Sequence, residues 1–315
     1  MRTIEIIVAV SIGSALLLPF VHWAVWSLIP PLSPRALAKK GHFVSIDGID
    51  TYYERYGSGP SLILIPPGGS HTSTWRFNVD ALSRSHEVWT FDLPGSGYSD
   101  KPEAFPYTHK SYAAFVRDFM TAMGIPKAVV AGQSLGATVA LEFALDFPEK
   151  TAGIVLIDSG GYPRGVTLGP HNPLRHRMTH AILMSLSSYP IVVKAFFSVL
   201  YHEPRSFARD SALVAEFCDI NRTPNARDAF FWMLRALRFD FAIPDVSRIR
   251  NVAVPTLIVW GRNDRVVDVA TASRFQQDIA GSQLVVIDEA GHQVHEEQPE
   301  AVNRAIASFL DSIRW

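Results

Sequence analysis

A serine enclosed between two glycines is the residue of this sequence best suited to covalent chemistry. The segment Gly132-Gln133-Ser134-Leu135-Gly136 follows a short apolar run at 128–131 and precedes an apolar helical segment. A sharp turn from a strand into a helix would strain the serine and raise its hydroxyl above the sheet. The N-terminus of the helix would stabilise negative charge that develops nearby. Ser134 is therefore the predicted nucleophile.

The serine needs a base, because its hydroxyl is a poor nucleophile until its proton is removed. His292 stands in a Gly-His pair just beyond the last predicted strand and before the closing helix, where an imidazole can reach over the sheet edge. We predict His292 as the base. His295, three residues later, is the alternative.

The base in turn needs a carboxylate that fixes its tautomer and stabilises the imidazolium. Asp264 follows the predicted strand at 256–260, and Asp158 follows the one at 153–157. Both would end at the carboxyl edge of the sheet. The motif Gly261-Arg262-Asn263-Asp264 favours Asp264 as the acid, with Asp158 as the alternative.

Backbone amides are the predicted donors to the oxyanion that acyl transfer generates. Leu135, directly after the nucleophile, supplies one N–H. The loop Pro66-Pro67-Gly68-Gly69 follows the predicted strand at 61–65 and supplies the other. Gly69 is the preferred donor, and Gly68 is the alternative.

The elements that must hold these residues alternate between strands and helices. Strands are predicted at 42–46, 51–56, 61–65, 87–91, 128–131, 153–157, 256–260 and 283–287, and helices at 111–123, 134–147, 269–279 and 299–313. The first two strands flank Asp47-Gly48, which indicates an antiparallel hairpin. The alternation elsewhere predicts a mostly parallel sheet with helices on both faces. Between about 162 and 250 it gives way to a helical, aromatic-rich insertion.

Composition excludes several classes of protein. The 315 residues are 48% apolar and 19% charged, so a large core can be buried. A formal net charge of −1 provides no basic excess for nucleic acid. Cys218 is the single cysteine, which rules out an intrachain disulfide and a Cys-based zinc site. Its apolar helical setting predicts a buried thiol.

The N-terminus is unusually apolar from residue 4 to residue 29. A run of that length would cross a hydrocarbon core of about 30 Å as a helix. We expect a single-pass membrane anchor at 1–30 and a Pro-rich linker at 31–41. A cleaved signal peptide and a hairpin broken at Pro19 are the alternatives. The distribution of Lys and Arg residues on either side of the run slightly favours a cytoplasmic catalytic domain.

In sum the motifs resemble those of the α/β-hydrolase superfamily, over residues 42–161 and 250–315. They are Pro67-Gly68-Gly69, Asp92-Leu93-Pro94-Gly95-Ser96-Gly97-Tyr98-Ser99, Gly132-Gln133-Ser134-Leu135-Gly136, Gly261-Arg262-Asn263-Asp264 and Gly291-His292. The resemblance implies an α/β-hydrolase fold: a mostly parallel eight-stranded sheet with a helical cap, here preceded by the N-terminal membrane anchor. The core would span 42–161 and 251–315, and the cap 162–250. This chain has Pro67-Gly68 where the family often has His-Gly, which leaves the backbone donor in place.

The function implied is acyl transfer by Ser134, Asp264 and His292, with no metal or organic cofactor required. A serine nucleophile argues against the related haloalkane dehalogenases and epoxide hydrolases, which use aspartate. The aromatic insertion and the expected anchor favour a lipophilic carboxylic ester, such as a monoacylglycerol-like lipid, as substrate. A carbon–carbon bond hydrolase of a dienoic ketone remains an alternative. So do a proline-type aminopeptidase using Glu203 or Glu216, and a non-catalytic binding protein on the same fold.

Overall fold

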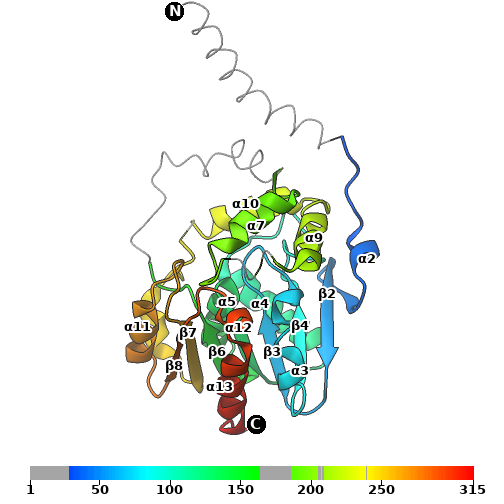
Figure 1. Ribbon diagram of the computed structural model, residues 1–315. Coiled ribbons are helices and arrows are strands. Elements are labelled where there is room, and N and C mark those ends of the chain that lie inside the picture. Colours follow the sequence, from blue (N-terminus) through cyan, green and yellow to red (C-terminus); the bar gives the residue numbers. More distant parts are fainter. Residues whose placement is uncertain (1–27, 164–185, 205–206, 208, 239) are drawn as a thin grey trace, which may run out of the picture.

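An eight-stranded sheet forms the centre of the computed structural model, which describes residues 28–163, 186–204, 207, 209–238 and 240–315 (Figure 1). The strands are β1 (His42–Ile46), β2 (Ile49–Tyr56), β3 (Ser61–Ile65), β4 (Glu87–Phe91), β5 (Ala128–Gln133), β6 (Thr151–Ile157), β7 (Thr256–Gly261) and β8 (Gln283–Ile287). Their order is β1-β2-β4-β3-β5-β6-β7-β8. β2 is antiparallel to β1 and β4, and every other pair is parallel. The predicted mostly parallel sheet with an initial hairpin is confirmed.

Continuous apolar runs form the central strands because both faces of the sheet are covered. In β3, Ile63 and Ile65 point into one core, and Leu62 and Leu64 point into the other. All four side chains are fully buried. The two-residue period thus divides each strand between two hydrophobic layers.

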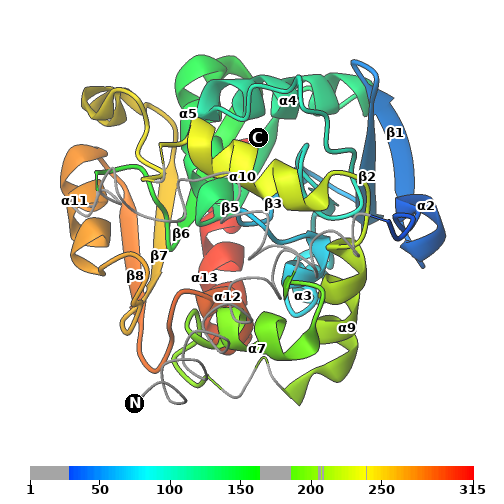
Figure 2. The ribbon, with the colours of Figure 1, turned by 90° about the horizontal axis from the view of Figure 1, so that it is seen from above.

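Helices cover the two faces (Figure 2). One face packs against α4 (His109–Ala122), α5 (Leu135–Asp146) and α11 (Ala270–Asp278). The opposite face packs against α3 (Val79–Leu82), α12 (Val294–Glu297) and α13 (Pro299–Asp311). Short elements complete this part of the chain: α2 (Pro34–Leu37), η1 (Thr72–Trp75), η2 (Pro148–Lys150) and η4 (Val246–Asn251).

Between β6 and β7, the described residues form three α-helices that lie above the sheet: α7 (Pro190–Ser198), α9 (Ser211–Ile220) and α10 (Ala226–Ala236) (Figure 1). α7 and α9 share a small aromatic core of their own, in which the Phe197 and Phe207 rings stack with centroids 4.3 Å apart. Cys218 belongs to this core and is buried, as predicted. We call α7, α9 and α10, with their connections, the cap helices.

The predicted membrane localisation is corrected by the structure. Within the described ranges, no helix is long and apolar enough to cross a membrane. The longest described helix, α4, has 14 residues, whereas a span needs about 20. The predicted anchor lies outside the described residues except at 28–30, and we assign no membrane localisation.

Replacing Phe309 in α13 with alanine tests how strongly this helix supports the sheet. Phe309 is 1% exposed within the core beneath α13. Its truncation should lower the free energy of unfolding by about 3–5 kcal/mol, as measured by urea denaturation. Arg304→Ala, at an exposed position of the same helix, is the control and should change stability by less than about 0.5 kcal/mol. Equal small losses in both variants would show that α13 is peripheral to the core.

Candidate active site

Ser134 occupies the turn from β5 into α5 in a strained conformation. Its φ is 53° and its ψ is −113°, a region that a non-glycine residue adopts at a cost of about 1–3 kcal/mol. A Cβ on Gly132 would lie 2.1 Å from the carbonyl oxygen of Gly136, and a Cβ on Gly136 would lie 2.2 Å from the carbonyl oxygen of Ile65. Both glycines are therefore required for the close approach of α5 to the strands.

Ser134, His292 and Asp264 form a continuous chain of hydrogen bonds. The Oγ of Ser134 lies 3.0 Å from Nε2 of His292, and Oδ2 of Asp264 lies 2.7 Å from Nδ1. Since an ionised carboxylate only accepts, Nδ1 carries the proton, and Nε2 is free to accept from the serine. The Oδ1 of Asp264 accepts from the amides of Val266 at 2.7 Å and Val267 at 2.9 Å. The structure thus joins the three residues predicted as nucleophile, base and acid.

Asp158, the alternative acid, occupies a different position. It is fully buried and accepts from the amides of Gly261 at 2.8 Å and Val294 at 3.3 Å. Burial, and then the nearby charge of Asp264, raise its pKa well above the usual value. No hydrogen bond joins Asp158 to His292 among the described residues. Asp158 instead ties the end of β7 to the segment that follows the base.

Three neighbouring side chains at this site are of types that can bind a metal ion. Ligand atoms of Asp158, Asp264 and His292 lie within 4.8 Å of one another. The hydrogen bonds of the two carboxylates to amides and to the imidazole occupy the atoms that a cation would need. The arrangement therefore fits a proton-transfer chain better than a metal centre.

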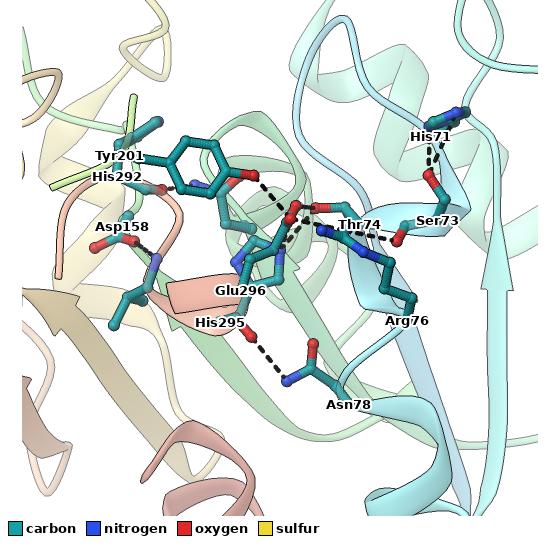
Figure 3. Close-up of polar contacts among 12 residues, drawn as sticks. His71, Ser73, Thr74, Arg76, Asn78, Asp158, Tyr201, His292, His295 and Glu296 are labelled. Carbon is teal, nitrogen blue, oxygen red and sulfur yellow. Dashed lines mark hydrogen bonds and ion pairs between the residues drawn. The ribbon is translucent and has the colours of Figure 1, made fainter. Parts of the chain in front are cut away.

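His295, the alternative base, has Thr74 as its side-chain partner (Figure 3). Its Nε2 lies 2.8 Å from Oγ1 of Thr74, and its ring centroid is 4.7 Å from that of Trp75. The side chain is fully buried. His295 thus connects the base segment to the helical turn η1 rather than to the nucleophile.

The two predicted oxyanion donors come from adjacent segments. Leu135 is the first residue of α5, so its N–H has no partner within the helix. Gly69 has a φ of +75°, which favours glycine. A Cβ on Gly68 would lie 3.1 Å from Cδ2 of Leu135, so the loop and the helix start are in contact. Neither the Gly69 amide nor the Leu135 amide has a backbone acceptor in the described part of the chain.

Asp92 holds this loop in place, a role that sequence reasoning did not assign. It is fully buried after β4 and accepts from the amide of Thr72 at 2.7 Å and that of Tyr98 at 2.8 Å. Burial raises its pKa to about 7. The sequence could have indicated this role, because Asp92 begins the Asp-Leu-Pro-Gly motif directly after a buried strand. A carboxylate in that place is costly to bury unless it has hydrogen-bond partners.

A cavity of about 1140 Å³ opens above the serine, between the strand ends and the cap helices. Its wall includes Gly68, Gly69, Ser134, Asp264 and His292. The side toward the cap is predominantly apolar and includes Val192, Val193, Phe196, Phe197, Leu200, Phe217, Ile220, Phe230, Met233 and Leu234. The other charged residues of the described lining are Lys101, Arg265 and Asp268.

The two glutamates considered for amine recognition do not line this cavity. Glu216 accepts from the hydroxyl of Tyr98 at 2.7 Å and lies 3.5 Å from Nε2 of His71. The Glu203 residue is exposed. Neither carboxylate is placed to hold the amine of a substrate bound at Ser134.

Sequence comparison identifies the class of protein. The model of the α/β hydrolase fold family matches residues 60–299, and the chain belongs to this family. Its strand order and the serine turn are the features through which that membership is visible in the structure.

Individual relatives span nearly the whole chain. An uncharacterized hydrolase of Bacillus subtilis, YugF, is 28% identical over 273 residues, covering 84% of this chain and 96% of the relative. A 2-hydroxy-6-oxo-2,4-heptadienoate hydrolase of Pseudomonas putida is 28% identical over 284 residues, covering 87% and 97%. The crystal structure of a meta-cleavage product hydrolase from Pseudomonas fluorescens superposes with a TM-score of 0.74 at 25% identity, covering 86% and 97%.

Replacing His295 with glutamine should make the fold less sensitive to acid. Burial, and then the charges of Arg76 and His292, lower the pKa of His295 to about 3, whereas an unfolded histidine titrates near 6.5. Between these values the unfolded chain binds more protons, so the unfolding free energy of the wild type falls as pH decreases. Relative to the wild type, His295→Gln should gain stability, on the order of a few kcal/mol, over that range.

Urea denaturation at a series of pH values measures this difference. His42→Gln, at an exposed site, controls for removal of an imidazole. A His295→Gln difference that stays constant from pH 7 to the acid limit of folding would contradict the prediction.

Proposed function

We propose that this protein hydrolyses a carboxylic ester with an apolar acyl or alcohol group, through an acyl-enzyme on Ser134. The observation that carries the proposal is the hydrogen-bonded chain Ser134–His292–Asp264 at the base of a large apolar cavity. Each link has the geometry that proton transfer requires, with heavy atoms within about 3 Å. The strained turn directs the serine toward the cavity.

Acylation begins when Ser134 transfers its proton to Nε2 of His292 and its Oγ bonds to the ester carbonyl carbon. The carbonyl electrons move onto oxygen, where the amides of Gly69 and Leu135 donate to the oxyanion. The carbon–oxygen bond to the alcohol then breaks, and the alcohol departs with the proton from His292. Asp264 remains ionised and holds the imidazolium in orientation.

Deacylation repeats these steps with water. His292 removes a proton from the water, whose oxygen bonds to the acyl carbon. The bond to Ser134 then breaks, and His292 returns the proton to its Oγ. The acid is released, and the enzyme regains its starting protonation state.

The character of the substrate follows from the cavity. Its cap side is built from aliphatic and aromatic side chains of α7, α9 and α10. A cavity of this size with few convergent polar groups favours an apolar ligand that it largely encloses. Lys101 lines the wall, but its ammonium already donates to the carbonyls of Gly97 at 2.7 Å and Ser99 at 2.9 Å. These observations support an uncharged ester.

A carbon–carbon bond hydrolase of a dienoic ketone is the second candidate. It is favoured by relatives named as dienoate hydrolases that match along most of their length. The same triad would serve, but a dienoate carries a carboxylate, which calls for a cation. Arg265, exposed and on the cavity wall, is the described residue best placed to supply one. The proline-type aminopeptidase receives less support, because neither Glu203 nor Glu216 lines the cavity. The non-catalytic binding protein receives less support, because it does not need an assembled triad.

A panel of p-nitrophenyl esters of increasing acyl length separates the two leading candidates. For wild-type protein, kcat/KM should rise roughly fourfold with each added methylene until the apolar wall is covered, since burial of a CH₂ contributes about 0.8 kcal/mol. Ser134→Ala and His292→Ala controls should be inactive and unlabelled by a fluorophosphonate probe. Fastest hydrolysis of the acetate, or cleavage of a dienoic ketone with no esterase activity, would contradict the ester proposal.

Paired amide substitutions distinguish the two carboxylates. Asp264→Asn should lower kcat on the preferred ester by about 10⁴-fold, because an asparagine favours the wrong tautomer of His292. Asp158→Asn keeps an acceptor for the amide of Gly261 and should have a far smaller effect. The reverse order of effects would identify Asp158 as the acid.

A further inference from the structure

The backbone of the catalytic base is fastened to the cap. The amide of His292 donates to the carbonyl of Leu200 at 2.8 Å, where Leu200 lies just after α7. Gly291, the residue before the base, also lies close to this part of the chain, because a Cβ on Gly291 would lie 2.6 Å from the amide nitrogen of His202. A cap connection at 200–203, which we call the cap strap, therefore runs directly against the base.

Glu297 joins the two segments through one carboxylate. Its Oε1 accepts from the amide of Gly291 at 2.7 Å, next to the base. Its Oε2 accepts from the amide of His202 at 2.7 Å, with a longer contact of 3.4 Å from the amide of Glu203. An acceptor with two oxygens on opposite segments fixes their separation, and hydrogen bonds to a charged group are stronger than neutral ones.

The neighbouring Glu296 bonds the side chain of Tyr201 in the same strap (Figure 3). It accepts from the hydroxyl of Tyr201 at 2.8 Å and from Thr74 at 2.6 Å, and it pairs with Arg76 at 2.7 Å. Because Thr74 and Arg76 belong to the region after the oxyanion loop, the strap is held against the core. Glu297 differs from Glu296 in that it bonds Gly291, the residue next to the base.

We propose that Glu297 is a positioning residue that sets the height of His292 above Ser134 by bracing the Gly291 amide against the cap strap. The inference rests on the proposed esterase function of the Ser134 site. Without the carboxylate, two amides lose their acceptor, and the base segment can shift relative to the nucleophile. Such a shift weakens the 3.0 Å contact between Nε2 and the serine.

The effect should appear in catalysis rather than in substrate binding. Glu297 is absent from the described lining of the cavity, so a bound ester does not touch it. Misplacement of a catalytic group by about 1 Å costs about 10²-fold in rate. We therefore expect Glu297→Ala to lower kcat on the preferred ester by about 10²-fold and to leave KM nearly unchanged. Glu297→Gln, which keeps one acceptor oxygen, should lose less.

The experiment compares Glu297→Ala, Glu297→Gln and Glu300→Gln, the last at an exposed position three residues away. It measures kcat, KM and the rate of fluorophosphonate labelling, with circular dichroism as the check of folding. The proposal is supported by a graded loss of kcat and of labelling rate at Glu297 and none at Glu300. It is overturned if both Glu297 variants match Glu300→Gln, or if the loss is entirely in KM. If the alanine variant does not fold, the glutamine variant alone decides.

A proton NMR measurement keeps the inference separate from the esterase proposal. The Nδ1 proton of His292, shared with Asp264, should give a downfield resonance that disappears in Asp264→Asn. If the wild type hydrolyses no ester, the proposed function fails, and this resonance still reports the position of the base. Its loss or broadening in Glu297→Ala supports the positioning role, and an unchanged resonance overturns it.

Discussion

The close approach of α5 to the carboxyl ends of the strands is the constraint on which the site depends. It places the start of a helix where a side chain on either flanking glycine would collide with backbone, and it holds Ser134 in a conformation that few residues adopt. The strain is sustained because the surrounding core over-determines it: β5 lies between β3 and β6, and α5 is buried along most of its length. The packing of the sheet and of α5 therefore holds the hydroxyl of Ser134 in its position.

Much of this arrangement can be predicted from the sequence, because local and global signals agree. The strands at Ser61–Ile65, Glu87–Phe91 and Gln283–Ile287 have the predicted bounds, since each is a short run of mostly apolar residues that turn or loop residues follow. The residues predicted as the triad meet because each follows a different parallel strand, and such strands end at one edge.

Other features could be recognised only in the structure. The role of Asp92 depends on two loops that are distant in sequence but share one buried carboxylate. The choice between Asp264 and Asp158 turns on which oxygen faces the imidazole, a difference that strand order alone does not reveal. The membrane anchor predicted from the N-terminal apolar run is not supported, because no helix among the described residues is long and apolar enough to cross a membrane.

The division of the site between core and cap has an evolutionary consequence. The residues proposed for chemistry precede or follow the segment that carries the cap helices, whereas much of the apolar wall lies within it. Selection can thus remodel the wall for a new substrate while the reaction centre is inherited unchanged. The cap strap limits this modularity, because a transplanted cap would also have to reproduce the backbone positions at 200–203 against which the base is seated. Substrate range in such a chain should diversify readily through α9 and α10, and more slowly through the end of α7.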